Sequence, residues 1–190
     1  MKRLVLILLL AACDAPTPDP QVEAALQSGA PALLISIEDQ DEAIAPFAAQ
    51  TARRGVTTWR SADGVSVTTR ADLLQATRGL GADMLASDTT QSATRLRINQ
   101  PGIAQRFHTF LNGEDQAVTR AYVCEITTRG PRQIDVGRGS EPARLMAEDC
   151  ASLTETFTNL YWIAPGGAVL QSRQWAGPFT GPLAIRRIPQ

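Results

Sequence analysis

Turn residues recur between short runs of alternating side chains along most of this chain, and they constrain its fold more than any other feature. Asp63-Gly64 separates Val56–Arg60 from Val65–Arg70, and Asp-Gly between two such runs is a strong signal for a β-hairpin. In the second run valines alternate with serine and threonine, as a half-buried strand requires. Comparable turn residues follow at Asn112-Gly113, Gly130-Pro131, Gly137-Arg138-Gly139 and Ala164-Pro165-Gly166-Gly167.

The segments between these turns have the composition of strands, and helix signals are sparse. Pro20–Gln27 predicts a short helix, and Ala82–Ala86 predicts a single helical turn. Pro46 interrupts the helix formers of Asp41–Gln50, whereas Ala71–Thr77 fits a helix or a strand. The sequence therefore predicts a mainly β protein, a single antiparallel domain built as a curved sheet, sandwich or barrel with few short helices. The strand-like runs are Arg106–Leu111, Ala117–Thr128, Phe157–Ile163 and Ala168–Trp175.

The N-terminus has the layout of a bacterial lipoprotein signal peptide. A basic start precedes the apolar run Leu4–Ala12, which rises about 13 Å as a helix and falls short of a hydrocarbon core of roughly 30 Å. Leu10-Ala11-Ala12-Cys13 resembles a lipobox, in which the thiol of the cysteine takes the diacylglyceryl group. We therefore predict that residues 1–12 are a signal peptide and that Cys13 is the lipidated N-terminus.

The residues after Cys13 predict a tether between a membrane and the folded domain. Prolines 16, 18 and 20 favour an extended polyproline conformation over residues 13–21, and residues 22–190 remain for the β-rich domain. Two or three acyl chains would make the membrane anchor stable. Asp14 resembles the signal that retains lipoproteins in the inner membrane of enteric bacteria, although it is also simply the first polar residue of the tether. We expect an exported protein on a bacterial membrane, facing the periplasm, with the inner membrane favoured.

Two cysteines remain once Cys13 carries lipid. In an oxidising compartment Cys124 and Cys150 favour a disulfide. A catalytic thiol would need a base, and His108 is the only histidine of the chain. The spacing of these residues does not match a zinc site. The sequence therefore predicts a disulfide, no metal site and no cofactor.

Composition and motifs exclude several classes of function. The chain has 18 basic and 19 acidic residues, without the basic excess of a nucleic-acid-binding protein. No serine-nucleophile elbow, Walker loop or HExxH motif occurs in the sequence, so we predict no catalytic residues. A polysaccharide hydrolase or lyase stays open as a minor alternative, because a glycosidase needs two facing carboxylates that a sequence cannot pair. The carboxylates considered are Glu114, Asp115, Glu148, Asp149 and Glu155.

Large aromatic residues lie in the strand-like runs and offer a second kind of site. Trp59, Trp162 and Trp175 would stack on sugar rings if they lay exposed on a curved sheet, and Arg173 would bind an anionic sugar or a partner carboxylate. The alternative for the tryptophans is packing in the core, and for the arginine a surface ion pair. These four residues are the candidate contacts for a glycan or a protein partner.

Several short segments form a recognisable series along the chain. They are Thr58-Trp59 with the Asp63-Gly64 turn, Ala76–Asp83, Gly113–Gln116, Arg120–Cys124, Phe157–Trp162 and Ser172–Trp175. In this order the segments resemble the YjbF/GfcB family of lipoproteins from exopolysaccharide and group 4 capsule operons. The resemblance extends from about Thr51 to Ile188, and Val22–Gln50 matches weakly.

The resemblance implies a periplasm-facing lipoprotein with a mostly β domain that serves the export or assembly of an extracellular polysaccharide. It also implies partners, namely an outer-membrane β-barrel protein and a periplasmic protein encoded in the same operon. No enzymatic activity comes with the family. We therefore expect a non-enzymatic accessory lipoprotein, and a glycan-binding module on the β-sheet is the alternative.

Overall fold

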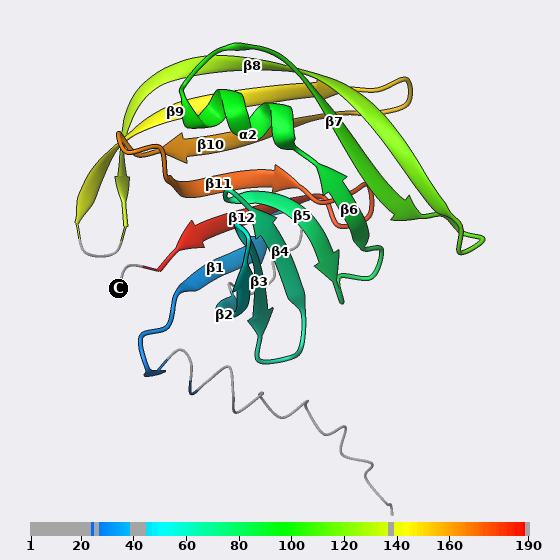
Figure 1. Ribbon diagram of the computed structural model, residues 1–190, viewed down its shortest axis with the longest axis horizontal. Coiled ribbons are helices and arrows are strands. Elements are labelled where there is room, and N and C mark those ends of the chain that lie inside the picture. The colour runs from blue at the N-terminus through cyan, green and yellow to red at the C-terminus, as the bar shows by residue number, and fades with distance from the viewer. Residues whose placement is uncertain (1–23, 25–26, 39–44, 137–138, 189–190) are drawn as a thin grey trace, which may run out of the picture.

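The computed structural model describes residue 24 and the ranges 27–38, 45–136 and 139–188, and these form one twelve-stranded antiparallel sheet (Figure 1). The predicted signal peptide, Cys13 and the tether lie outside the described residues, as does most of Pro20–Gln27. The elements are β1 (Ala32–Ile37), β2 (Ala45–Arg53), β3 (Val56–Ser61), β4 (Ser66–Arg70), β5 (Leu73–Arg78), β6 (Met84–Asp88), α2 (Thr90–Arg97), β7 (Gly102–Leu111), β8 (Ala117–Asp135), β9 (Ser140–Ala151), β10 (Thr156–Ile163), β11 (Val169–Trp175) and β12 (Pro182–Arg187).

Two meanders make up the sheet. The strands β1 to β5 follow one another as neighbours, and so do β6 to β12. Antiparallel pairing of β1 with β12 joins the meanders, with Leu33 opposite Arg187 and Ile37 opposite Leu183. Short hairpins connect most of these strands, in agreement with the predicted antiparallel fold class.

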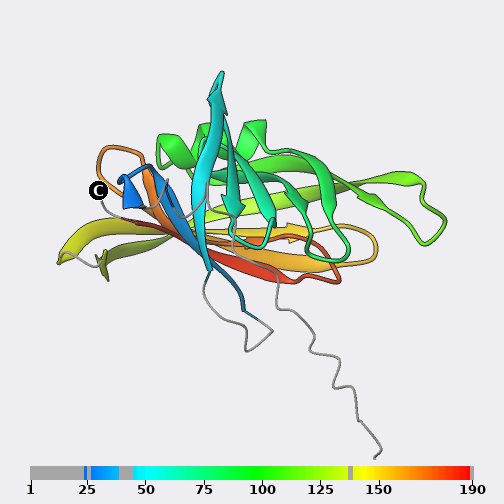
Figure 2. The same cartoon turned by 90° about the horizontal axis from the view of Figure 1, so that it is seen from below.

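The sheet curls until its two edge strands approach each other, which gives a nearly closed, barrel-like shape (Figure 2). Side chains link these edges. The Ser87 hydroxyl donates to the carbonyl of Leu74 at 2.7 Å, and Gln75 Nε2 donates to Thr89 Oγ1 at 2.8 Å. Register shifts, for example between Thr128 and Gly130 of β8, bend individual strands and help the sheet to curl.

The core lies on the concave face of the curled sheet. One apolar cluster joins β1–β6 to β12 through residues such as Ile35, Phe47 and Leu183. A second cluster, with Ile126 and Met146, lies beneath α2 and receives Leu96 from that helix. The helix therefore covers part of the concave face of the second meander.

Some of the local expectations were wrong. Ala82–Ala86, expected as a helical turn, leads into β6. Residues 45–50, the end of the segment whose helix formers Pro46 interrupts, belong to β2. Pro46 is tolerated in β2 because it lies beyond the last residue that pairs with β3, although it is still opposite Leu34 of β1. On the β3 side, the missing N–H of proline therefore costs no hydrogen bond. The ambiguous Ala71–Thr77 is largely strand β5, and α2 was not predicted.

Candidate functional site

Strict alternation along β7 places a charged side chain inside the curled sheet. Ala104, Arg106, His108 and Phe110 are buried, while most residues between them are exposed. Arg106 is 1% exposed, and its Nη1 donates to Glu148 Oε2 at 2.5 Å and to the Tyr161 hydroxyl at 3.0 Å. An arginine this deeply buried is stable only with such partners.

Glu148, from β9, is the centre of this interior cluster. Its carboxylate accepts hydrogen bonds from Asn159 Nδ2 at 2.9 Å, from the Tyr161 hydroxyl at 2.9 Å and from the Ser92 hydroxyl of α2. Burial alone would raise the pKa of Glu148, but the charge of Arg106 and these three donors outweigh burial and hold the pKa below its ordinary value. Glu148 is therefore an ionised, fully paired group without access to solvent. We call Ser92, Arg106, Glu148, Asn159 and Tyr161 the interior cluster.

Of the other carboxylates considered for hydrolysis, two are engaged in local structure and two lie in an exposed turn. Glu155 accepts from Arg120 Nη1 and from the Tyr122 hydroxyl, both at 2.6 Å. Asp149 accepts from Thr158 Oγ1 at 2.6 Å and pairs with Arg129 at 3.3 Å. Glu114 and Asp115 belong to the exposed turn between β7 and β8. These carboxylates line neither the cavity of about 10 Å³ beside Asp72 nor the pocket of about 500 Å³ beside Phe47.

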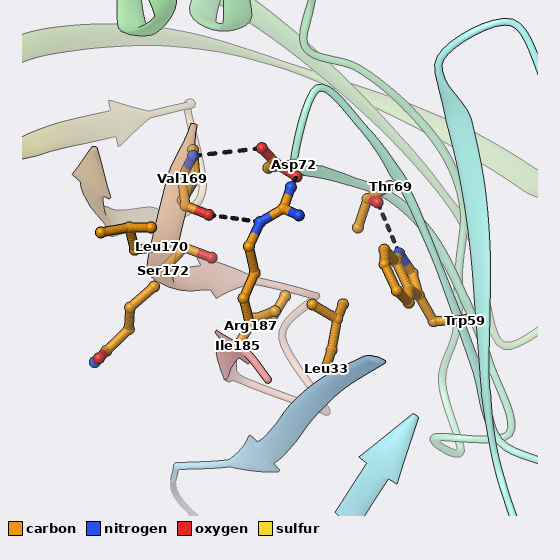
Figure 3. A pocket seen from close by; sticks show the side chains of 10 residues that line it. Leu33, Trp59, Thr69, Asp72, Val169, Leu170, Ser172, Ile185 and Arg187 are labelled. Atoms are coloured by element: carbon orange, nitrogen blue, oxygen red, sulfur yellow. Dashed lines mark hydrogen bonds and ion pairs between the residues drawn. The ribbon is translucent and has the colours of Figure 1, made fainter. Parts of the chain in front are cut away.

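One end of the concave space is closed by an ion pair between the two meanders (Figure 3). Asp72 comes from the tight β4–β5 turn, where Ala71 and Asp72 both have positive φ angles of 48° and 66°. Its carboxylate pairs with Arg187 of β12 and accepts from the Val169 N–H of β11 at 3.4 Å. The cavity beside them holds about 10 Å³, which is room for at most one water molecule. This cavity therefore offers no space for a ligand larger than a water molecule.

Two of the three candidate tryptophans pack into the protein. Trp59 is 5% exposed, and its indole N–H donates to Thr69 Oγ1 at 2.9 Å. Trp175 is half-buried and stacks on Phe157, with ring centroids 5.6 Å apart and an interplanar angle of 11°. Core packing, the alternative weighed for the tryptophans, describes both positions.

Trp162 and Arg173 lie together on the convex face. Both alternate with buried neighbours, on β10 and β11 respectively, and both are half-buried. Arg173 donates to the Thr158 carbonyl at 2.9 Å and forms an ion pair with Glu38. The strand registers place a row of side chains across four strands beside them, and we call it the outer row: Leu34, Arg186, Gln171 and Trp162.

Cys124 and Cys150 are opposite each other on β8 and β9 and form a disulfide with a Cα–Cα distance of 4.0 Å. Glu148 lies close to both sulfur atoms. This group offers no thiolate to a metal, because both sulfurs are bonded to each other and the carboxylate belongs to the interior cluster. Cys13, the predicted lipidation site, lies outside the described residues.

The interior cluster was not predicted from the sequence. Alternation along Gly102–Leu111 would have placed Arg106 and His108 on the same face as Ala104 and Phe110. The acceptor for Arg106 comes from β9 and the further donors from β10 and α2, so no local pattern joins them.

Comparisons with known proteins agree with this architecture. Residues 11–188 match the family described as group 4 capsule polysaccharide lipoprotein gfcB, YjbF. The crystal structure of the hypothetical lipoprotein YmcC from Escherichia coli (K12) has a similar fold, with a TM-score of 0.75 and 15% sequence identity. The similarity covers 92% of this chain and 90% of that chain. The search of curated proteins gave no match. Within the described residues, no helix has the length and hydropathy that a membrane crossing requires.

Proposed function

The chain belongs to the family of group 4 capsule polysaccharide lipoproteins named gfcB, YjbF, and from this premise we propose that it is a lipid-anchored, non-enzymatic accessory protein for the export or assembly of an extracellular polysaccharide. The observation that carries the proposal is the extent of the match, since residues 11–188 include Cys13 and the whole described sheet. The match therefore covers both the predicted lipidation site and the folded domain.

The state of the carboxylates supports a non-enzymatic role. A glycosidase places one carboxylic acid and one carboxylate on either side of the bond that it cleaves. Glu148 is enclosed by its donors, and Glu155 is held by Arg120 and Tyr122. Moving either group to a substrate would break a network of hydrogen bonds.

We place the protein on a bacterial membrane, facing the periplasm. Lipid on Cys13 would anchor it there, and Asp14 favours the inner membrane. Its partners would be the outer-membrane β-barrel protein and the periplasmic protein of the same operon. Acting beside them, it would assist export without changing the polymer chemically.

A strain that lacks the gene, complemented with variants of it, tests this proposal. The wild-type chain is expected in the membrane fraction and restores the polysaccharide, whereas Cys13→Ala releases the protein from the membrane and leaves the polysaccharide low. The physical reason is that the thiol of Cys13 is the attachment point for the acyl chains. Immunoblots of membrane and soluble fractions, with polysaccharide measured on the same cells, give the result.

Thr17→Ala is the matched control, because it changes the tether and leaves the lipobox intact. We expect it to behave like the wild type in both readouts. Persistent membrane association of the Cys13→Ala protein would contradict the lipid anchor, and full restoration of polysaccharide by that variant would contradict the need for it.

A second candidate function is direct binding of the polysaccharide on the convex face. The outer row carries an indole, an amide and a guanidinium in adjacent register, and Arg173 lies in the neighbouring position of β11. An aromatic ring stacks on the apolar face of a sugar, while amide and guanidinium groups bind its hydroxyl or acidic groups. Trp59 and Trp175 take no part, because they pack into the protein.

Affinity electrophoresis in gels that contain the organism's own purified polymer measures such binding. Trp162→Ala is expected to weaken the affinity for the polymer about fivefold or more, since an aromatic contact is worth on the order of 1 kcal/mol beyond the area that it buries. Phe179→Ala is the control, because Phe179 is 67% exposed and lies on the β11–β12 loop, away from the outer row. Equal retardation of the wild type and Trp162→Ala would exclude this surface.

A further inference from the structure

The concave space is open at the end opposite the Asp72–Arg187 ion pair. Leu33 of β1 and Thr69 of β4 line the small cavity beside the ion pair. Ile37, at the other end of β1, and Val65, just before β4, line a pocket of about 500 Å³. We call this second space the mouth pocket. Its lining residues are Ile35, Ser36, Ile37, Ala45, Phe47, Ser61, Asp63, Val65, Val67, Leu80 and Leu183.

The mouth pocket is a continuation of the apolar core. Ile35, Phe47, Val67 and Leu183 line it and also belong to the apolar cluster that joins β1–β6 to β12. The partly buried side chains that pack on this cluster include Ile37 and other residues of the lining. Its volume lies within the roughly 300–1,000 Å³ of small-molecule sites, which are concave and mostly apolar.

Two of the polar residues of the lining, Ser61 and Asp63, are hydrogen-bonded to each other, and Ser36 is the third polar residue. The Ser61 hydroxyl donates to the Asp63 carboxylate and lies 3.2 Å from the Val65 carbonyl. Asp63 itself is exposed, on the turn between β3 and β4. Most of the described lining is therefore aliphatic or aromatic, and its one charged group, Asp63, lies toward solvent.

The mostly apolar lining favours an apolar ligand. A sugar would bury hydroxyl groups against aliphatic side chains and leave them without hydrogen bonds, which is costly. A single aliphatic chain needs no such bonds and gains from removal of its surface from water. We propose that the mouth pocket binds one aliphatic chain of a lipid, with the polar end of the lipid toward Asp63 and solvent.

Two sources can supply such a chain. One is the acyl group that lipidation would place on Cys13 of this protein, an origin that rests on the proposed function. The other is an acyl chain of a separate lipid, which requires no modification of Cys13. The binding chemistry is the same for both.

Fluorescence titration with methyl cis-parinarate tests the pocket, because the emission of this neutral aliphatic probe rises in an apolar environment. The protein is the mature chain from residue 13 with Cys13→Ala, made without the signal peptide, so that no acyl group of its own competes. Saturable binding of one probe molecule is the expected result. Ala45→Phe, which fills the lining from β2, is expected to weaken it at least tenfold.

Ala52→Phe is the matched control, since Ala52 is an exposed residue of the same strand. It is expected to bind the probe as tightly as the parent chain. Ile37→Asn is a second variant in case Ala45→Phe does not fold, and it is expected to weaken binding by introducing an amide into the lining. Absence of saturable binding, or equal binding by the folded pocket variants, would overturn the proposal.

Solvent extraction of the purified Cys13→Ala chain, followed by mass spectrometry, distinguishes the two sources. An aliphatic lipid at one molecule per protein identifies a separate lipid as the occupant. An empty extract from a chain that binds the added probe counts against a separate resident lipid and favours the protein's own acyl group. Failure of probe binding would leave the polysaccharide experiment unaffected, so the two proposals fail separately.

Discussion

Arg106→Met is expected to lower the free energy of unfolding by about 3–5 kcal/mol, the cost of leaving one member of a buried ion pair without its partner. Arg106 and Glu148 are 1% and 0% exposed, and Arg106 supplies the positive charge next to this carboxylate. Without it, the donors Ser92, Asn159 and Tyr161 would face a buried carboxylate that is destabilised as an anion. Urea denaturation of the two proteins at neutral pH, with the disulfide intact, measures the difference.

Arg129→Met is the matched control for this substitution. Arg129 pairs with Asp149 at 3.3 Å, and the two side chains are 53% and 44% exposed. An exposed pair of this kind contributes about 0–1 kcal/mol, so this variant is expected to remain close to the wild type. Equal losses for Arg106→Met and Arg129→Met would show that the interior cluster does not stabilise the fold.

His108→Phe is expected to make the free energy of unfolding less sensitive to acid. His108 is 0% exposed, and its ring stacks on Phe157 at 5.6 Å and lies 4.9 Å from the ring of Tyr122. Neither ring nitrogen has a hydrogen-bond partner among the residues that the structure describes. Burial, and secondly the like charge of Arg106, lower the pKa of His108 to about 3.

The sign of the pH effect follows from proton binding. Between pH 3 and about 6.5, the ordinary pKa of histidine, the unfolded chain binds a proton at this position and the folded protein does not. Stability is therefore lost as the pH falls below about 6.5. At pH 4.5 the loss through His108 amounts to about 2–3 kcal/mol at most, and His108→Phe abolishes it.

Unfolding free energies of the wild type and His108→Phe at pH 7.5 and 4.5 test this prediction. Acidic groups whose pKa values are lowered, such as Glu148 and Asp88, also make the protein less stable in acid. Their contribution is the same in both proteins, so it cancels when the two unfolding free energies are subtracted. At pH 7.5 the variant is expected to be at least as stable, because it removes two unpaired buried nitrogens. An identical pH dependence in the two proteins would contradict the buried, neutral state of His108.

The hairpins were the most predictable part of the fold, because their signals are local. Gly64 has a φ of 90° in the turn predicted from Asp63-Gly64. The turn at Asn112-Gly113 is also present, but its left-handed residue is Asp115, with a φ of 58°. There Asn112 Oδ1 accepts the N–H groups of Glu114 and Gln116. The sequence predicted the presence of this turn but not its conformation.

Contacts between distant segments could not be predicted from local patterns. Nothing in the alternation of β1 indicates that its partner is β12, far away in the sequence, yet this pairing joins the two meanders. Trp59 and Trp162 have similar strand contexts, but the curl of the sheet places one in the core and the other on the convex face. The same limit explains why the interior cluster, gathered from four elements, was missed.

Surface polysaccharide per cell in the strain without the gene is the decisive measurement for the proposed role. The amount is expected to fall when the gene is deleted and to return with the wild-type chain, because an accessory lipoprotein acts on the yield of export. Amount and chain length are measured on extracts from equal numbers of cells. A clean deletion in which both the amount and the chain length of the polymer stay unchanged would contradict the role in polysaccharide export or assembly.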